Sequence, residues 1–421
     1  MRKRNGLLAL LAVVLSFSLV FTGCAKKTEE NKTGEKPEQK LVLAVGDEGS
    51  TLDPNKMSDL YAADVVNQTF ETLVKFDANG KIVPALAEKW EVSPDGTEYT
   101  FYLRDAKWSD GTPVTAKDVK FSWLRLLDPK TAAPYAYLLT DSAPIKGAKE
   151  FNSGKAKADA VGITVVNDKT IKVKLVSPSL NFLSIVTMPQ LVPINEKTVK
   201  ENPDFLVKDN LNIICNGPFM YKEYKPKEKV VLVKNPNYWD AKNVKLEQVE
   251  FNFVSDQQTA TTLFEQGKLD LTVDLIPPAL LEQYMSQGKA KEISGLNTNF
   301  AALNTKLAPL NNPKVRKALA MAIDREGLTK ILPRQKAAYA FVPFGIKEPD
   351  GKDFREKGGS LIEYNVEEAK KLLAEAGYPD GKGFPELRYL TADRETSKKI
   401  AQYLQEQWRK NLNISTKLEV M

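Results

Sequence analysis

The chain alternates short apolar runs with capped amphipathic helices, and this alternation limits its fold more than any other feature of the sequence. Residues 41–45 predict a buried strand, because they are apolar and run into a turn rich in Gly, Asp, Ser and Pro. Residues 99–103 alternate in the manner of a half-buried strand, and further strands are expected at 170–176, 230–233 and 249–253. Helices fall between and after them, without internal repeats. The sequence therefore predicts a mixed α/β fold.

Three helix starts carry clear capping signals. Thr115 with Asp118 three residues later forms a capping box. Asn312 precedes Pro313, which suits a first helical turn because its missing N–H is not needed there. Asn365 opens another helix. Apolar residues recur at helical spacing after each cap, so we assign these helices to core packing and give them no chemistry.

The N-terminus is typical of an export signal. Basic residues at positions 2–4 precede an apolar run at 7–22, which is shorter than the run of about 20 residues that spans a membrane. Residues 21–24 resemble a bacterial lipobox, although Phe21 stands where that motif usually has leucine. The resemblance implies lipidation of Cys24, which would become the first residue of the mature chain. The alternative is an incidental cysteine at the end of an export signal.

Residues 25–39 contain no large apolar side chain and are rich in Lys, Glu, Thr and Asn. Such a segment buries little, so we expect a solvated tether. Removal of residues 1–23 lowers the formal charge from +6 to +3, because that leader has three basic residues and no acidic ones. The remaining charge is scattered, without the clustered basic residues of a nucleic-acid surface, so no nucleic-acid partner is expected.

Composition limits the chemistry of the chain. It has no histidine, which excludes Ser/His/Asp and Cys/His triads and histidine-ligated zinc. Its two cysteines, Cys24 and Cys215, form no disulfide framework. Cys215 reads as a small buried hydrophobe rather than a reactive thiol. We therefore expect no catalytic residue, no metal and no cofactor.

Seven segments in order resemble the extracytoplasmic oligopeptide-binding proteins of ABC importers, family 5 of the bacterial solute-binding proteins. They are STLDPNK from Ser50, the segment IVPALAEKWEVSPDGTEYTFYLRDAKWSDGTPVTAKDV from Ile82, DPKTAAPYAYLL from Asp128, NGPF from Asn216, KNPNYWDAKNVKLEQVEF from Lys234, NPKVRKALAMAIDRE from Asn312 and EAKKLLAEAGY from Glu368. The segments extend over more than three hundred residues, so an accidental match is not expected.

This resemblance implies a fold similar to the type II periplasmic binding proteins, with two lobes and an extra domain. The expected layout is a signal peptide at 1–23, the lipidated cysteine and tether at 24–40, and the solute-binding domain at 41–421. Within that domain, one lobe with the inserted domain covers about 41–297, and the other lobe, with a hinge near 299–304, covers about 298–421.

Ligand contacts are carried over from the family only where its motifs are present. The resemblance implies contacts at Ser58, Asp59 and Leu60 after LDPNKM, at Tyr135 in APYAYL, and at Asp274 in DLTVDLIPP, where the match is looser. Tyr135 could instead fill the core, Asp274 could be an ordinary loop or cap residue, and Leu60 could act through its backbone alone.

The resemblance also implies a longer chain. In the family, a continuation beyond the strand that NISTKLEV resembles carries an aspartate that pairs with the peptide's α-amino group, and a segment that completes the first lobe. No carboxylate of this chain can be assigned that role. We therefore expect 421 residues to be a truncated form with impaired binding, or the gene product to be longer, and we favour truncation.

The resemblance predicts a monomeric receptor on the outer face of the cell membrane, held by a lipid, which captures extended oligopeptides and delivers them to an ABC permease and its ATPase subunits. An extended peptide suits such a receptor because its backbone can be bound as an added strand. Alternatives are a receptor of the same fold for an oligosaccharide or metal chelate, a sensor of signalling peptides, and an exported hydrolase that uses paired carboxylates.

Overall fold

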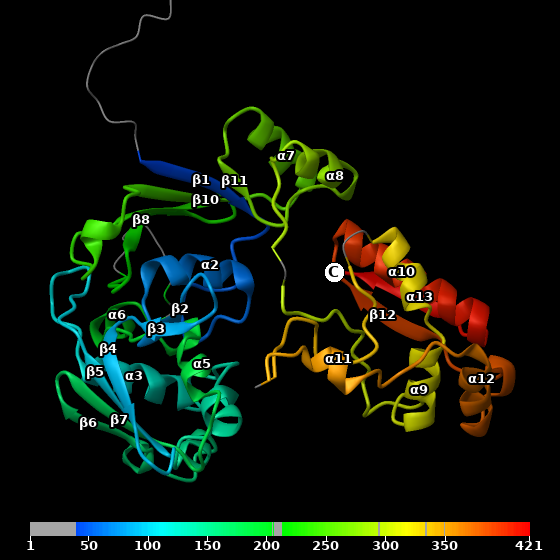
Figure 1. Ribbon diagram of the computed structural model, residues 1–421, viewed down its shortest axis with the longest axis horizontal. Helices are drawn as coiled ribbons and strands as arrows, with labels where there is room; N and C mark the ends of the chain where they lie inside the picture. Colours follow the sequence, from blue (N-terminus) through cyan, green and yellow to red (C-terminus); the bar gives the residue numbers. More distant parts are fainter. Residues whose placement is uncertain (1–38, 204, 206–212, 294, 333–334, 349) are drawn as a thin grey trace, which may run out of the picture. The chain divides into compact units, whose positions relative to one another are not determined.

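The chain divides into two compact units, and the first ends at Ile276 while the second begins at Pro277. A computed structural model describes residues 39–421, except 204, 206–212, 294, 333–334 and 349 (Figure 1). The expected leader and Cys24 lie outside the described residues, and the expected lobe boundary near 297 stays a prediction. Within the described part of the chain, no helix has the length and apolar character needed to cross a membrane.

The first unit contains a five-stranded mixed sheet in the order β11-β1-β10-β9-β8. β1 pairs in parallel with β10 and β11, and the other neighbours are antiparallel. This position explains the apolar run of β1, because a strand between two parallel neighbours is usually covered on both faces. The expected strands at 41–45, 230–233 and 249–253 are confirmed. The strands are β1 (Lys40–Val45), β8 (Phe219–Lys225), β9 (Lys229–Lys234), β10 (Gln248–Phe253) and β11 (Leu271–Thr272).

A four-stranded antiparallel sheet in the order β4-β5-β7-β6 and a separate hairpin, β2 with β3, complete the strands of this unit. Along β5, Tyr99, Phe101 and Leu103 are buried and alternate with less buried residues, so one face of the strand meets the core. The expected strand at 99–103 is observed, and the strand expected at 170–176 is observed in a shorter form that ends at residue 174. Their bounds are β2 (Val74–Phe76), β3 (Ile82–Pro84), β4 (Ala87–Val92), β5 (Glu98–Leu103), β6 (Ile163–Asn167) and β7 (Thr170–Lys174).

Helix α3 contacts β6 and β7 and begins at the expected capping box. The Asp118 carboxylate accepts hydrogen bonds from the Thr115 N–H at 2.7 Å and from its hydroxyl at 2.9 Å. The helices of the first unit are α2 (Leu60–Thr69), α3 (Ala116–Leu127), α4 (Ala148–Asn152), α5 (Phe182–Val186), α6 (Glu196–Glu201) and α7 (Gln257–Glu265), with short helical turns η1 (Leu138–Ser142), η2 (Ala158–Ala160), η3 (Pro189–Leu191) and η4 (Ala241–Asn243).

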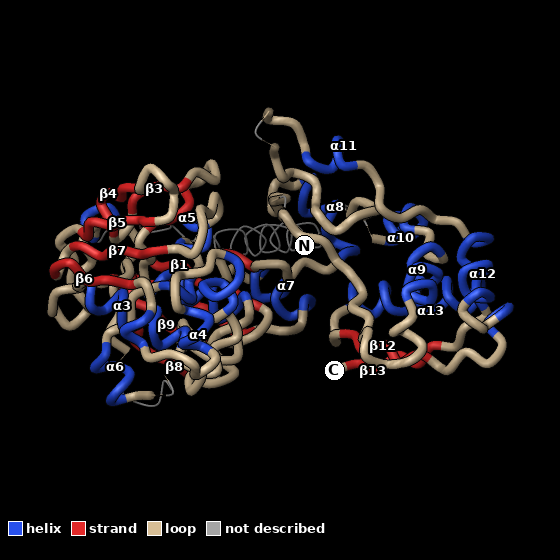
Figure 2. Tube along the Cα trace, turned by 90° about the horizontal axis from the view of Figure 1, so that it is seen from below, coloured by secondary structure: helices blue, strands red, loops and turns tan. Residues whose placement is uncertain are grey.

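In the second unit, helices pack on a pair of parallel strands. α9 and α13 both contact α12, and α13 also contacts the two strands (Figure 2). The core of this unit includes Leu319, Leu373 and Trp408. The expected caps are confirmed, because the side chains of Asn312 and Asn365 accept backbone N–H bonds in the first turns of α9 and α12. The elements are α8 (Pro278–Ser286), α9 (Pro313–Met321), α10 (Arg325–Ile331), α11 (Phe354–Gly358), α12 (Val366–Glu375), η5 (Pro379–Gly381), β12 (Leu387–Thr391), α13 (Glu395–Leu412) and β13 (Thr416–Val420).

Candidate ligand-binding site

A buried ion pair fixes the segment that leads to the expected contact residues. Arg125 of α3 donates from Nη1 to Asp53 Oδ1 at 2.8 Å and from Nη2 to Asp53 Oδ2 at 2.6 Å. Its Nη1 also donates to Asn55 Oδ1 at 2.9 Å. The Asp53 side chain is fully buried and that of Arg125 is only 10% exposed. Such bidentate pairs are directional, so α3 sets the position of the 50–59 loop.

Asn55 connects the same loop to two more parts of the unit. Its side-chain nitrogen donates to the carbonyl of Gln190 at 3.0 Å and lies 3.4 Å from the hydroxyl of Ser122. The Ser122 hydroxyl in turn donates to the carbonyl of Val192 at 2.6 Å. Buried polar contacts with the interior of the first unit thus hold the loop. The loss of any one of them would cost free energy, because a buried polar group would be left without a partner.

Ser58, Asp59 and Leu60 stand where this loop becomes helix α2. Ser58 is exposed, and the Leu60 side chain is 80% exposed. Asp59 is the N-cap of α2, because its Oδ1 accepts from the Ala62 N–H at 2.9 Å. Its Oδ2 accepts from the N–H and the hydroxyl of Ser50, at 2.9 and 2.7 Å. The Asp59 carboxylate therefore binds its own chain, which leaves Ser58 and Leu60 as the accessible side chains.

Tyr135 lies in another part of the first unit, shortly before η1. It is half-buried and packs against the main core, with its ring centroid 5.7 Å from that of the more exposed Tyr137. Within the described residues, no hydrogen bond or ring contact joins Tyr135 to the 58–60 turn. Its observed surroundings are those of a residue at the edge of the core, and its ligand contact stays a prediction.

Asp274 follows β11 and is exposed, with a left-handed backbone at φ 54°. Its carbonyl oxygen lies 3.4 Å from the side-chain nitrogen of Gln257. The pKa of Asp64 is raised, mainly by burial and to a lesser extent by the negative charge of Asp274. The charge of Asp274 thus acts on a residue of helix α2 one turn beyond Leu60, and the ligand contact of Asp274 stays a prediction.

A cavity of about 250 Å³, here named the α2 pocket, lies beside Asp64. No motif of the sequence pointed to Asp64, although it follows Leu60 by four residues and thus shares its face of the helix. The pocket is lined by Leu41, Leu43, Asp64, Gln68, Phe219, Leu246, Val249, Phe251 and Val273.

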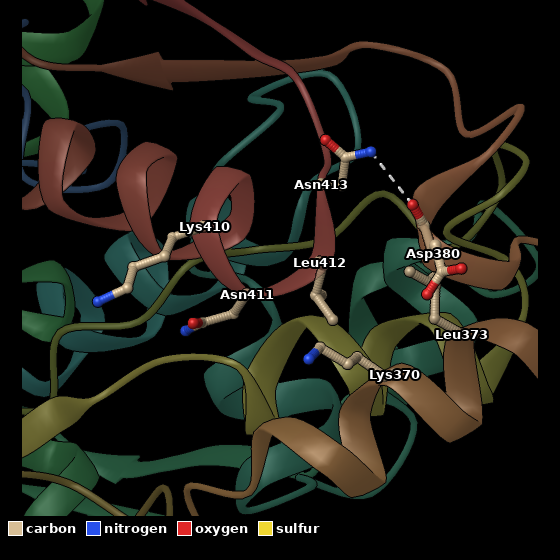
Figure 3. A pocket seen from close by; sticks show the side chains of 7 residues that line it. All are labelled: Lys370, Leu373, Asp380, Lys410, Asn411, Leu412 and Asn413. Carbon is tan, nitrogen blue, oxygen red and sulfur yellow. Dashed lines mark hydrogen bonds between the residues drawn. The ribbon is translucent and has the colours of Figure 1, made fainter.

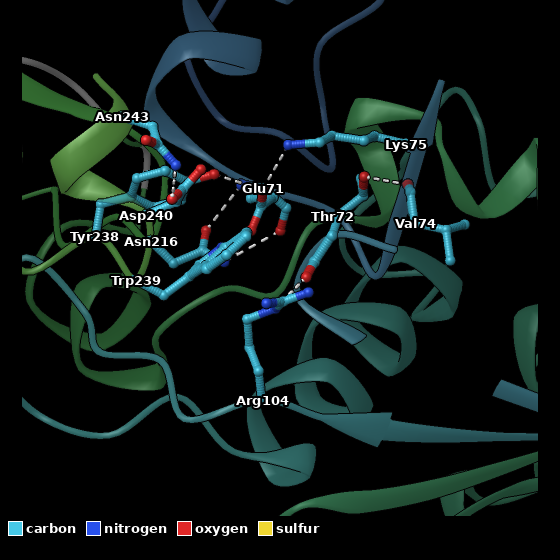
Figure 4. Close-up of polar contacts among 11 residues, drawn as sticks. Glu71, Thr72, Val74, Lys75, Arg104, Asn216, Tyr238, Trp239, Asp240 and Asn243 are labelled. Atoms are coloured by element: carbon cyan, nitrogen blue, oxygen red, sulfur yellow. Dashed lines mark hydrogen bonds and ion pairs between the residues drawn. The ribbon is translucent and has the colours of Figure 1, made fainter. Parts of the chain in front are cut away.

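A buried carboxylate, Glu71, joins three distant segments of the first unit (Figure 4). Its carboxylate accepts hydrogen bonds from the Tyr238 hydroxyl and from Trp239 Nε1, both at 2.6 Å. It also forms an ion pair with Lys75 at 3.2 Å. Its backbone N–H and carbonyl both bond the side chain of Asn216, at 3.0 and 3.1 Å. Burial, followed by the charge of Glu71, raises the pKa of Tyr238. All these groups are satisfied by one another, so we assign them a structural role.

A cavity of about 150 Å³ lies in the second unit, where α13 ends (Figure 3). Asn413 donates from Nδ2 to the carbonyl of Asp380 at 3.2 Å, and both residues have left-handed backbones. Lys370 pairs with Glu367 at 3.2 Å. These features serve a reversal of the chain, and we assign no ligand to the cavity. It is lined by Lys370, Leu373, Asp380, Lys410, Asn411, Leu412 and Asn413.

Two kinds of chemistry lack support in the described part of the chain. The thiol of Cys215 is fully buried, and burial raises its pKa to about 12, so the reactive thiolate is absent at neutral pH. The expectation of a small buried hydrophobe is confirmed. No group of three or more His, Cys, Asp or Glu side chains there could hold a metal ion.

The mixed α/β units, with their parallel and antiparallel sheets, belong to the class of type II periplasmic-binding proteins, as the predicted fold class states. The sequence profile described as "Bacterial extracellular solute-binding proteins, family 5 Middle" matches residues 81–421. The chain therefore belongs to family 5 of the bacterial extracellular solute-binding proteins.

Relatives with known names and structures agree with this membership. The dipeptide-binding protein DppE of Bacillus subtilis is 36% identical, over 98% of this chain and 76% of its own length. The oligopeptide-binding protein OppA of the same organism is 32% identical, over 100% of this chain and 78% of its own length. The solved murein tripeptide-binding protein MppA of Escherichia coli is similar with a TM-score of 0.81 at 33% identity, covering 92% of this chain and 75% of that one.

Proposed function

We propose that the chain is an extracytoplasmic receptor that binds extended oligopeptides for delivery to an ABC permease and its ATPase subunits. The observation that carries this proposal is the similarity over 98% of the chain to a protein named for dipeptide binding. Support comes also from a solved relative, OppA of Listeria monocytogenes bound to peptide, which is similar with a TM-score of 0.78 at 33% identity, covering 91% of this chain and 77% of that one.

The anchored 50–59 loop suits this function. Arg125 and Asn55 hold the loop from the interior, so Ser58 and Leu60 are presented without a further cost in backbone ordering. Main-chain groups there can bond the amides and carbonyls of an extended peptide, which are the same in every sequence. Ordered water can fill the space beside small side chains. A receptor of this kind tolerates varied peptides.

A ligand panel with matched variants tests the proposal. Short peptides, oligosaccharides and metal chelates, at up to millimolar concentration, are added to the purified chain, and the melting temperature is followed. Peptides should raise it, because binding to the folded state alone is stabilising. Leu60→Lys should abolish the shift, whereas Leu180→Lys, which changes another exposed leucine of the first unit, should preserve it. A shift with sugars alone would refute the peptide assignment.

We also propose the layout of the chain and its attachment to the membrane. Residues 1–23 are a leader, Cys24 carries the lipid, and the tether to residue 40 leads to the solute-binding domain at 41–421, whose lobes divide near 297. Intact-mass measurement of the membrane fraction should show a lipidated chain that begins at Cys24. Cys24→Ser should release the protein from the membrane, and an unmodified chain that retains Met1 would contradict the anchor.

The receptor is proposed to act as a monomer. Size-exclusion chromatography with light scattering should give the mass of one chain with and without peptide. A stable dimer at micromolar concentration would contradict this part of the proposal.

A further inference from the structure

The α2 pocket combines an apolar wall with one charged side chain. Seven of its lining residues are apolar, and they come from β1, β8, β10 and the segments around them. The polar lining groups are Asp64 and Gln68, one turn apart on α2. All of them belong to the first unit, so the pocket exists whatever the position of the second unit.

Asp64 differs from two other carboxylates of this unit that are shielded from solvent. Asp53 is paired with Arg125 at 2.6 Å, and Glu250 is paired with Lys40 at 3.0 Å. In the part of the chain that the structure describes, Asp64 has no ion-pair partner, and the like charge of Asp274 adds to burial in raising its pKa. The ionised form of a half-buried carboxylate that has no ion-pair partner is stabilised by a cation placed beside it.

We propose that the α2 pocket binds a basic side chain of the peptide ligand, a lysine or arginine. The aliphatic stem lies against the apolar wall, and the cationic head reaches Asp64 and Asp274. This inference rests on the proposed function and adds to it a preference for one class of peptide.

The shape and charge of the pocket favour this occupant over others. Lysine and arginine have apolar stems of three or four methylene groups that bury well while the charged head stays polar. A volume of about 250 Å³ accommodates such a side chain. An acidic side chain would meet the like charge of Asp64 in the pocket lining. A purely apolar side chain would desolvate Asp64 further without pairing it, which costs free energy.

Matched peptides test the preference. Tripeptides of alanine with one lysine at the first, second or third position are compared by calorimetry at pH 7 with the same peptides containing norleucine, which has the stem but not the ammonium. At one position at least, we expect lysine to bind about three- to tenfold more tightly, as for a partly screened ion pair. Asp64→Asn should remove the difference, and Asp274→Asn should reduce it.

Two controls separate a binding effect from a folding effect. Asp159→Asn removes one negative charge from an exposed turn that precedes β6, and the lysine preference should persist in it. Asp64→Asn keeps the shape of the side chain and relieves its repulsion with Asp274, so the melting temperature should not fall.

The possible failures are distinct. If peptides bind without a lysine preference, this inference is overturned while the proposed function stands. If the preference persists in both Asp64→Asn and Asp274→Asn, the cation binds elsewhere, and the inference is again overturned. If none of the tripeptides binds even at millimolar concentration, while sugars or chelates do, the proposed function fails and this inference fails with it.

Discussion

Replacement of Arg125 by methionine should destabilise the first unit by about 3–5 kcal/mol, the cost of breaking a buried ion pair. The side chain makes two charge-assisted bonds to Asp53, of 2.8 and 2.6 Å, and a third to Asn55. Methionine fills a similar volume but cannot donate a hydrogen bond to Asp53 or to Asn55. Asp53 would keep one donor, the Asn55 N–H at 3.0 Å, and would otherwise be a buried, uncompensated charge.

Urea unfolding followed by tryptophan fluorescence measures this loss. Four of the five tryptophans lie in the first unit, among them the buried Trp108 and Trp123, so the signal reports mainly on that unit. The midpoint should fall while the slope stays constant. Lys117→Met is the matched control, because it removes a cation of the same helix whose partner, Asp168, is exposed like itself. Its midpoint should stay unchanged.

A double variant decides whether the uncompensated charge is the cause. Asp53→Asn removes that charge but keeps an oxygen for the Asn55 N–H, so Arg125→Met with Asp53→Asn should be more stable than Arg125→Met alone, by about 1–2 kcal/mol. If Arg125→Met costs less than about 1 kcal/mol, or if the second substitution makes it worse, the reasoning from a buried charge is refuted.

Three further changes probe the other carboxylates. Glu71→Gln should cost about 2–3 kcal/mol in urea unfolding, because the amide keeps one oxygen as an acceptor and sets its NH2 group against one of the two donors, Tyr238 or Trp239; an unchanged midpoint would contradict this. Asp59→Ala should lower stability by about 1 kcal/mol, whereas Asp59→Ser should retain most of it as an alternative N-cap; equal losses would argue against a capping role. Asp64→Asn should stabilise the chain at pH 7, since a raised pKa means that the folded state disfavours the ionised form. That advantage should disappear as the pH falls through the raised pKa to below about 4, where the carboxyl is protonated in both states, and a constant advantage would refute the assignment.

The sequence predicted features whose causes are local. The capping box at Thr115 was foreseeable, because its residues are three positions apart and the bonds form within one helical turn. The contacts of Glu71 were not, since Tyr238 and Asn216 lie 167 and 145 residues away, and only the tertiary fold brings them together. Asp59 had a local signal of a helix start that was not used, namely an aspartate directly before an apolar helical pattern.

A ligand gains binding free energy from a carboxylate only when that carboxylate is not already bonded to other groups of the chain. Asp53 and Asp59 already bind their own chain, so a peptide could contact them only by displacing bonds that hold the loop and helix in place. If the chain binds peptides as proposed, its loop contacts fall mainly on backbone groups and on the exposed Ser58 and Leu60, which suits ligands of varied sequence. Discrimination between ligands then requires a group whose charge is still uncompensated, and Asp64 is such a group among the described residues. Tolerance and preference can therefore coexist in one unit, because they depend on different side chains.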